Sequence, residues 1–248
     1  MTKNILFNIG TTIVTLIFIS ILLIKRFGYF PSGKPIDLLE KYTEFTHSHL
    51  HGWILDNPTA TSVILYCKDR KGDMSHYQHK AKAIRDMGYK VIMFDYSGYG
   101  KSSGVPSEQQ LYDDASMITS LIQQQHSPNQ IIIWGEGMGA PIATHAAIRY
   151  RIPTLILDSP IPSINTLVRT HLGRAKFLAL PFNEFNTAVY LGVYTGKSLL
   201  IHSVNNPIIP YETTLELRKL STHHIPIVGD QDLPWGDIKA FIETSHIH

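Results

Sequence analysis

Residues 131–140, with the sequence IIIWGEGMGA, constrain the fold of this chain more than any other segment. Three isoleucines and a tryptophan form a continuous apolar run, which is typical of a β-strand buried on both faces of a sheet. Gly135, Gly137 and Gly139 follow at alternate positions, and a helix-like segment begins at once. A buried strand that turns sharply into a helix is a building unit of layered α/β folds.

The same alternation of strand-like and helix-like segments continues along the chain. Apolar runs that predict strands lie at 62–67, 91–94, 154–157, 198–201 and 225–228. Segments that predict helices lie at 76–87, 107–127, 140–150, 211–220 and 235–244. Repeated strand–helix units predict a mostly parallel sheet with helices on both faces. The irregular, aromatic-rich stretch 160–197 predicts a cap inserted between two strands.

Composition limits the class of protein. The chain has 248 residues, 44% of them hydrophobic, with a formal net charge of +2. This is enough for one substantial core, which we assign to a single domain over residues 45–248. The charge is too small to indicate nucleic-acid binding. Cys67 is the only cysteine, so the chain forms no internal disulfide.

The N-terminus is unlike the rest of the chain. Residues 5–24 carry no charge and follow a short tail, 1–4. About twenty apolar residues are the length needed to cross a bilayer, so we predict an uncleaved, single-pass membrane anchor. Residues 25–44 would then be a linker. Lys25 and Arg26 directly follow the apolar stretch, which favours a cytosolic position for the C-terminal domain.

A series of short motifs resembles the α/β-hydrolase superfamily, in particular its small membrane-anchored branch of serine aminopeptidase-like and acyl-hydrolase-like proteins. The matching segments are LHGW at 50–53, LYC at 65–67, DYSGYGKS at 95–102, the run 131–140, DSP at 158–160, and 202–210. The motif at 95–102 is the most specific, because it is long and stands at the expected distance before the run at 131–140. The resemblance covers about residues 45–245 and implies an α/β-hydrolase fold.

In that superfamily a serine, an acid and a histidine follow one another, each from a loop at the carboxyl end of a strand. The resemblance places Gly137 where the turn Gly-x-Ser-x-Gly carries its nucleophile. It places Asn206 at the acid and Asp230 at the histidine. Glycine has no side chain that could attack a substrate, and neither of the other two residues is the group that relays the proton. The sequence therefore predicts that no functional catalytic residue remains.

The loop that supplies the oxyanion hole also departs from the pattern implied by the resemblance. Family members usually have His-Gly-Asn at this place, whereas this chain has Lys68, Asp69 and Arg70. The backbone amide of Met138 is the one donor that we expect to remain. We therefore predict a membrane-anchored, hydrolase-like protein that acts by binding a small acyl or anionic ligand or a protein partner. The alternative is an active ester or acyl hydrolase that uses another nucleophile: Ser75, Ser97 or Ser159.

Other patterns leave weaker alternatives open. The spacing Gly135-x-Gly137-x-x-Ala140, with Asp158 at the end of the next strand, also fits a dinucleotide-binding fingerprint. The histidines at 47, 49 and 51 alternate along an expected edge strand, which would direct them to one face as weak candidate metal ligands. Lys68, Arg70, Lys71 and Lys101 predict a basic rim that could receive an anionic group. We expect no cofactor.

Overall fold

The computed structural model describes residues 10–12, 14–15, 42–172, 185–228 and 232–245. The strands among these residues are β1 (Thr43–His47), β2 (Leu50–Leu55), β3 (Val63–Cys67), β4 (Lys90–Phe94), β5 (Ile131–Glu136), β6 (Thr154–Asp158), β7 (Lys197–Ser203) and β8 (His223–Ile227). The helices are α2 (Gln78–Asp86), α3 (Glu108–Gln123), α4 (Gly139–Arg149), α5 (Ile164–Leu172), α6 (Thr187–Val193), α7 (Leu215–Leu220) and α8 (Trp235–Ser245). Short 3-10 turns precede α2, β5 and α7 at Met74–Tyr77, Pro128–Gln130 and Tyr211–Thr214.

In the described part of the chain, the strands form one sheet in the order β1-β2-β4-β3-β5-β6-β7-β8. Strand β2 pairs antiparallel with both β1 and β4, and all other neighbours are parallel. This is a mostly parallel sheet, as the alternating segments predict, with an antiparallel hairpin added at one edge. The carboxyl ends of β3 to β7 meet along one edge of the sheet, where loops can bring side chains together.

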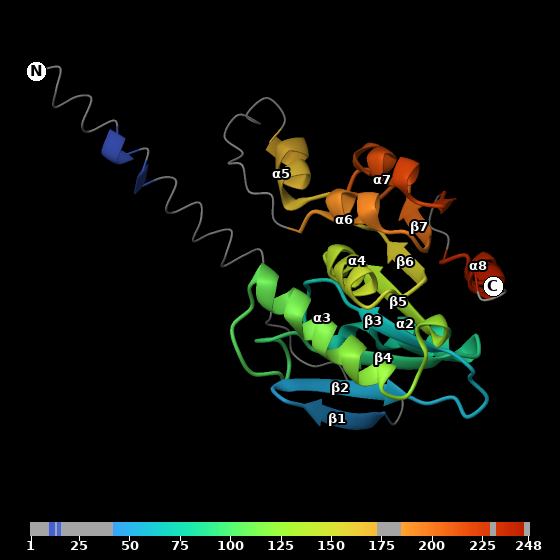
Figure 1. Ribbon diagram of the computed structural model, residues 1–248. Coiled ribbons are helices and arrows are strands. Elements are labelled where there is room, and N and C mark those ends of the chain that lie inside the picture. The colour runs from blue at the N-terminus through green and yellow to red at the C-terminus, as the bar shows by residue number, and fades with distance from the viewer. Residues whose placement is uncertain (1–9, 13, 16–41, 173–184, 229–231, 246–248) are drawn as a thin grey trace, which may run out of the picture.

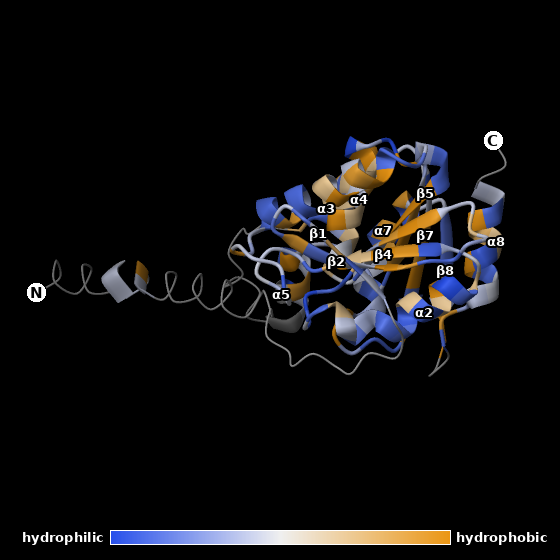
Figure 2. Cartoon of the chain, turned by 90° about the horizontal axis from the view of Figure 1, so that it is seen from below, coloured by the Kyte–Doolittle hydropathy of each residue, from blue (hydrophilic) through white to orange (hydrophobic). Residues whose placement is uncertain are grey.

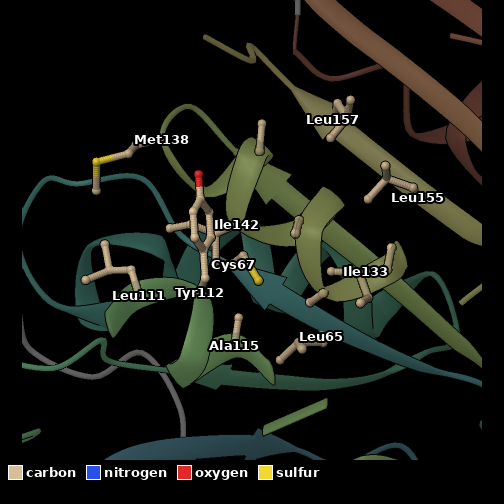
Figure 3. Close-up of a cluster of buried hydrophobic side chains, with 14 of the residues drawn as sticks. Leu65, Cys67, Leu111, Tyr112, Ala115, Ile133, Met138, Ile142, Leu155 and Leu157 are labelled. Atoms are coloured by element: carbon tan, nitrogen blue, oxygen red, sulfur yellow. The ribbon is translucent and has the colours of Figure 1, made fainter. Parts of the chain in front are cut away.

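Helices cover both faces of the sheet (Figure 1). On one face, α3 and α4 pack on apolar side chains of the central strands, and Figure 3 shows this core at close range. On the other face, residues of α2 and α8 pack against the alternate side chains of the same strands. Colouring by hydropathy shows the strands as mostly hydrophobic and the helices as mixed (Figure 2). The two-sided burial explains why the central strands read as continuous apolar runs.

The cap segment differs from the irregular stretch that the sequence predicts, because it contains α5 and α6. Both helices begin at a side chain that accepts a hydrogen bond from the first turn: Ser163 Oγ from the Thr166 amide (3.0 Å) and Asn186 Oδ1 from the Val189 amide (3.0 Å). Such caps contribute on the order of 1 kcal/mol, which matters for short helices rich in Thr and Val. In Figure 1 these two helices lie together with α7.

The predicted membrane anchor at 5–24 lies almost entirely outside the described residues. Gly10–Thr12 and Val14–Thr15 are described, and they are helical. In the part of the chain that the structure describes, no helix has the length and apolar character needed to cross a bilayer. Anchoring remains a prediction from the sequence.

Candidate functional site

The turn between β5 and α4 has the form of a nucleophile elbow. Gly137 has φ +54°, a left-handed conformation that is costly for residues with a Cβ. Its amide donates to the Asp158 carbonyl (2.9 Å), and its carbonyl accepts from the Ala140 amide (3.2 Å). Gly139 is equally constrained for a different reason, since a Cβ there would lie 2.1 Å from the Cys67 carbonyl oxygen. The glycines therefore keep the elbow's shape and let α4 begin directly against β3.

The place where an elbow side chain would project is filled by Asp69. A Cβ built on Gly137 would lie 2.4 Å from Asp69 Oδ1. The same carboxylate oxygen accepts a hydrogen bond from the Met138 amide at 2.7 Å. The amide that the sequence predicts as the remaining oxyanion-hole donor is thus occupied by a carboxylate of the chain itself. A carboxylate on the first amides of a helix is also favoured by the helix dipole.

Lys68, the residue before Asp69, points away from the elbow and into the core. Its side chain has no solvent exposure, and its ammonium lies 4.0 Å from the centre of the Tyr99 ring. Lys68 Nζ donates to the Gly72 carbonyl (2.8 Å) and lies 3.9 Å from Asp95 Oδ1. Burial lowers the pKa of Lys68 to about 8, although the nearby carboxylates oppose this shift. A buried lysine cannot belong to a solvated basic rim, so this part of the prediction is wrong.

Of the other cations predicted for that rim, Lys101 pairs with Glu44 (Nζ to Oε2, 2.9 Å). Lys71 is exposed, and Arg70 is half-buried. The four cations therefore have different environments, and at least two of them are already bound by other groups of the chain.

The residue predicted at the acid position has a local structural role. Asn206 Oδ1 accepts from the amides of Ile208 (3.0 Å) and Ile209 (2.9 Å), which closes the turn after β7. His202, four residues earlier, is buried, and its Nε2 donates to the Ile209 carbonyl at 2.9 Å. Burial lowers the pKa of His202. The position predicted for the base, Asp230, lies outside the described residues.

The three histidines considered as metal ligands do not share a strand. His47 ends β1 and His51 lies in β2, while Ser48 (φ +55°) and His49 form the hairpin turn between them. His51 Nε2 contacts Glu44 at 2.8 Å, whereas His49 faces a different set of side chains. The prediction that all three point to one face is therefore wrong, because a two-residue turn reverses the chain. No group of three or more metal-ligating side chains is close enough to bind an ion in the described parts of the chain.

Ser97, one of the alternative nucleophiles, lies against an imidazole. His49 Nε2 is 2.9 Å from Ser97 Oγ and 3.2 Å from Asp114 Oδ1. Ser97 also donates both its amide (2.7 Å) and its hydroxyl (2.9 Å) to the Asp114 carboxylate. In a catalytic triad the serine and the acid lie on different nitrogens of the ring, so that the ring can pass a proton. Here both lie on Nε2, and the fully buried hydroxyl is already bound to the acid.

The other two alternative serines are also held by carboxylates. Ser75 is buried and donates its hydroxyl to Asp73. Ser159 (φ +48°) donates to Asp158 Oδ1 at 3.1 Å. The other oxygen of Asp158 binds Lys80 Nζ at 2.6 Å. If Lys80 were to act as the base for Ser159, it would first have to lose its proton. The ion pair with Asp158 opposes that loss.

Sequence reasoning missed the cluster around Lys80. Lys80 Nζ also lies 2.6 Å from Glu136 Oε2, which accepts a hydrogen bond from the Tyr66 hydroxyl. Burial alone would lower the pKa of Lys80, but the charges of Asp158 and Glu136 outweigh it and raise the pKa. Glu136 and Asp158 end neighbouring strands and are paired in register. Two adjacent carboxylates at one edge of a sheet are stabilised by a cation between them. The pairing of Glu136 with Asp158 could therefore have predicted a lysine at the place of Lys80.

The dinucleotide alternative is not favoured by these contacts. A ribose-binding carboxylate would have to be available at the end of β6, but Asp158 is bound by Lys80 and Ser159. The amide of Met138, which a phosphate would approach, is bound by Asp69.

A sequence profile of the family described as "Serine aminopeptidase, S33" matches residues 59–208. The chain is 26% identical over 212 residues to the uncharacterized protein YfhR of Escherichia coli (strain K12), covering 79% of this chain and 74% of YfhR. It is 34% identical over 187 residues to the lysophosphatidylserine lipase ABHD12 of Danio rerio, covering 67% of this chain and 49% of the lipase. The match therefore spans about half the length of that lipase.

Among solved structures, the Pyrococcus furiosus esterase Pf2001 superposes on this chain with a TM-score of 0.65 and 20% sequence identity. The superposition covers 87% of this chain and 94% of the esterase. At this identity, the similarity shows a shared α/β-hydrolase fold.

Proposed function

Because the chain belongs to the serine aminopeptidase S33 family of α/β-hydrolase-fold proteins, we propose that it is a member that has lost hydrolase activity and acts by binding. One observation carries this proposal. At the elbow, Gly137 provides no nucleophile, and Asp69 fills both the space of the missing side chain and the hydrogen-bonding position on the Met138 amide. A substrate carbonyl would have to displace this carboxylate before its oxygen could reach the amide.

Two contributions to catalysis are affected at the elbow. Loss of the serine from such a catalytic unit costs about a millionfold in turnover, and what remains depends largely on the oxyanion hole. A free oxyanion hole lowers the barrier by about 3–4 kcal/mol per donor. Here the Met138 amide already donates to an anion, so it is not available to stabilise a second one. Both contributions to catalysis are therefore removed at one turn.

Two features support a binding role. An open cavity of about 410 Å³ lies within the predicted cap and beside α7, lined by mostly polar side chains: Pro162, Ser163, Thr166, Arg169, Asn186 and Glu216. The apolar N-terminal stretch 5–24 supports placement at a membrane, with the domain on the cytosolic side. We propose that this domain binds an acyl or anionic ligand, or a protein partner, next to the bilayer.

The main alternative is an ester or acyl hydrolase that uses a different nucleophile. It is favoured by the 2.9 Å contact between His49 Nε2 and Ser97 Oγ, and by the lipase and esterase names of similar proteins. The burial of Ser97 and the placement of Asp114 on the same ring nitrogen argue against it.

A fluorophosphonate probe distinguishes the two functions, because it labels only activated hydroxyl groups. We expect no labelling of the full-length protein under conditions that label a family member with an elbow serine. The matched variant is Ser97→Ala. Labelling of the unmodified protein that disappears in Ser97→Ala would establish the alternative and overturn the proposed loss of activity.

Membrane anchoring has its own test. Deletion of residues 5–24 should move the protein from the membrane fraction to the supernatant after carbonate extraction. Added protease should digest the domain of the intact protein in inside-out vesicles but not in right-side-out vesicles. Extraction of the intact protein by carbonate would refute the anchor.

A further inference from the structure

Residues 68 to 72 connect a half-buried site, which holds the carboxylate of Asp69, with a fully buried site, which holds the ammonium of Lys68. The carboxylate of Asp69 occupies the elbow, where it accepts the Met138 amide at 2.7 Å. The ammonium of the preceding residue, Lys68, is enclosed in the core on the other side of the loop. Because the two residues are adjacent in the chain, a backbone movement of the loop that withdraws one side chain from its site also displaces the other.

Aromatic rings surround the Lys68 ammonium. The ring centres of Tyr99, Tyr96 and Tyr77 lie 4.0, 5.2 and 5.9 Å from Nζ. Its closest oxygen partner is the Gly72 carbonyl at 2.8 Å, with the Asp69 carbonyl at 3.5 Å.

The charged groups that face Lys68 are all carboxylates. They belong to Asp95 at the end of β4 and to Asp69 and Asp73 of the adjoining loop. The nearest, Asp95 Oδ1, lies 3.9 Å away, beyond hydrogen-bonding distance. Asp95 is itself buried and accepts the Met74 amide at 2.9 Å. The three tyrosine rings therefore shield the ammonium from water, and its ion pair with Asp95 is long, so the buried charge carries a desolvation cost.

We propose that residues 68–72 form a latch over the former oxyanion pocket, held closed by Asp69 on the Met138 amide and biased toward opening by the buried charge of Lys68. The inference rests on the proposed binding function in one respect, because binding of a ligand is what would require this pocket to open. In the open form, Lys68 reaches water and the elbow amide becomes free for an external ligand.

The pH dependence has a definite sign. Burial lowers the pKa of Lys68 to about 8, whereas a solvated lysine has a pKa of about 10.4. The closed form therefore holds fewer protons than the open form between these two values. Opening is then most favourable below pH 8, and it becomes about tenfold less favourable for each pH unit above that value. Asp95 changes this little, since its pKa of about 6 leaves it charged throughout the range.

Hydrogen exchange of the Met138 amide measures the opening in the full-length protein, after correction for the intrinsic pH dependence of exchange. In the unmodified protein we expect protection of this amide to rise about tenfold per pH unit from pH 8 to 10. Lys68→Met removes the buried charge while keeping an apolar side chain of similar length. It should increase protection at pH 7 by at least tenfold and make it independent of pH. Lys68→Arg keeps its charge and should show low protection throughout.

A purely structural role for Lys68 predicts the reverse. If Lys68→Met lowers the protection of Met138, or if protection in the unmodified protein does not change between pH 8 and 10, the proposal is wrong. Asp69→Asn provides a second measurement if Lys68→Met does not fold, because weakening the contact with Met138 should reduce protection at every pH. Fluorophosphonate labelling of the unmodified protein would contradict the loss of activity alone and leave the exchange result unaffected.

Discussion

Two polar clusters at the carboxyl edge of the sheet each have one half of a hydrolase site: the first has the backbone geometry, and the second has the residue types. The elbow between β5 and α4 has the geometry of a hydrolase nucleophile site, with Gly137 at φ +54°, but an aspartate of a neighbouring loop fills it. The cluster after β4 has the three residue types of a proton relay, His49, Ser97 and Asp114, but two of them meet on one ring nitrogen. Strand β3 lies between β4 and β5 in the sheet, so the two clusters belong to separate loops.

Under the proposed loss of activity, the two clusters show that neither backbone geometry nor residue identity alone provides catalysis. At the elbow, the backbone has kept its shape because glycine tolerates it and α4 packs closely there. In the second cluster, Asp114 satisfies the Ser97 amide and hydroxyl in a fully buried position, which is a structural task. The same three residue types can thus fix a loop when the ring is not placed to relay a proton.

The largest effect should come from removing the buried acid of the second cluster. Asp114→Ala leaves the Ser97 amide without a partner, and loss of such a buried group costs about 3–5 kcal/mol. Tm should fall by about 10 °C in a domain of this size, as measured by circular dichroism. Asp113→Ala is the matched control, because that half-buried neighbour accepts a hydrogen bond from the exposed Gln109 and should change stability by less than about 0.5 kcal/mol. Equal effects of the two variants would contradict a structural role for this cluster.

At the elbow, Gly137→Ser tests whether the site can accept its missing residue. The new Cβ would meet Asp69 and occupy a left-handed conformation, so we expect a loss of about 2–4 kcal/mol and no esterase activity. Gly137→Ala should cost a similar amount, since the contact comes from Cβ.

Combining Gly137→Ser with Asp69→Gly should recover the part of the loss that comes from the contact, but not the backbone strain. Robust ester hydrolysis by either serine variant would show that the remaining catalytic positions are misassigned.

Stability should also depend on pH through the acid beside the elbow loop. Burial raises the pKa of Asp95 to about 6, so the folded state favours its protonated form. This contribution is present below pH 4 and is lost as pH rises through 6, a change of about 2–3 kcal/mol. Asp95→Asn keeps an acceptor for the Met74 amide and should flatten this part of the profile, measured by urea unfolding from pH 3.5 to 7. Identical profiles for the two proteins would rule out the shift.

The smallest effect should come from Ser97→Ala. The variant loses one hydroxyl donor to Asp114 while the Ser97 backbone amide still bonds to the acid, so we expect a cost of about 1 kcal/mol. Any hydrolysis measured for the unmodified protein should be unchanged. If Ser97→Ala instead abolished hydrolysis with little change in stability, the second cluster would be identified as an active site.

The sequence predicts the central fold well, because strands buried on both faces leave continuous apolar runs, and the helix predicted at 107–127 is found as α3, which Ser107 caps. The hairpin between β1 and β2 is missed because Ser48 and His49 are not the usual residues of a two-residue turn. Helices α5 and α6 are missed because two polar caps start them against a weak helical propensity.

The site is predicted only in part. The resemblance locates the elbow, since its glycine spacing is a property of the backbone and is visible in the sequence. The contents of the elbow depend on how a neighbouring loop folds, and no local pattern indicates that Asp69 turns toward Met138. The burial of Lys68 is harder to predict, because lysine is rarely buried and its surroundings combine the Gly72 carbonyl with tyrosine rings from several segments of the chain.

The occupied elbow has an evolutionary consequence. A back-mutation that restored serine at position 137 would place its Cβ against the Asp69 carboxylate, so the revertant would be less stable before it gained any advantage. Under the proposed loss of activity, regaining hydrolysis would need changes at both positions, and neither change alone would restore catalysis. On the same proposal, the contact between Asp69 and Met138 lowers the chance that a single substitution at position 137 would bring hydrolysis back.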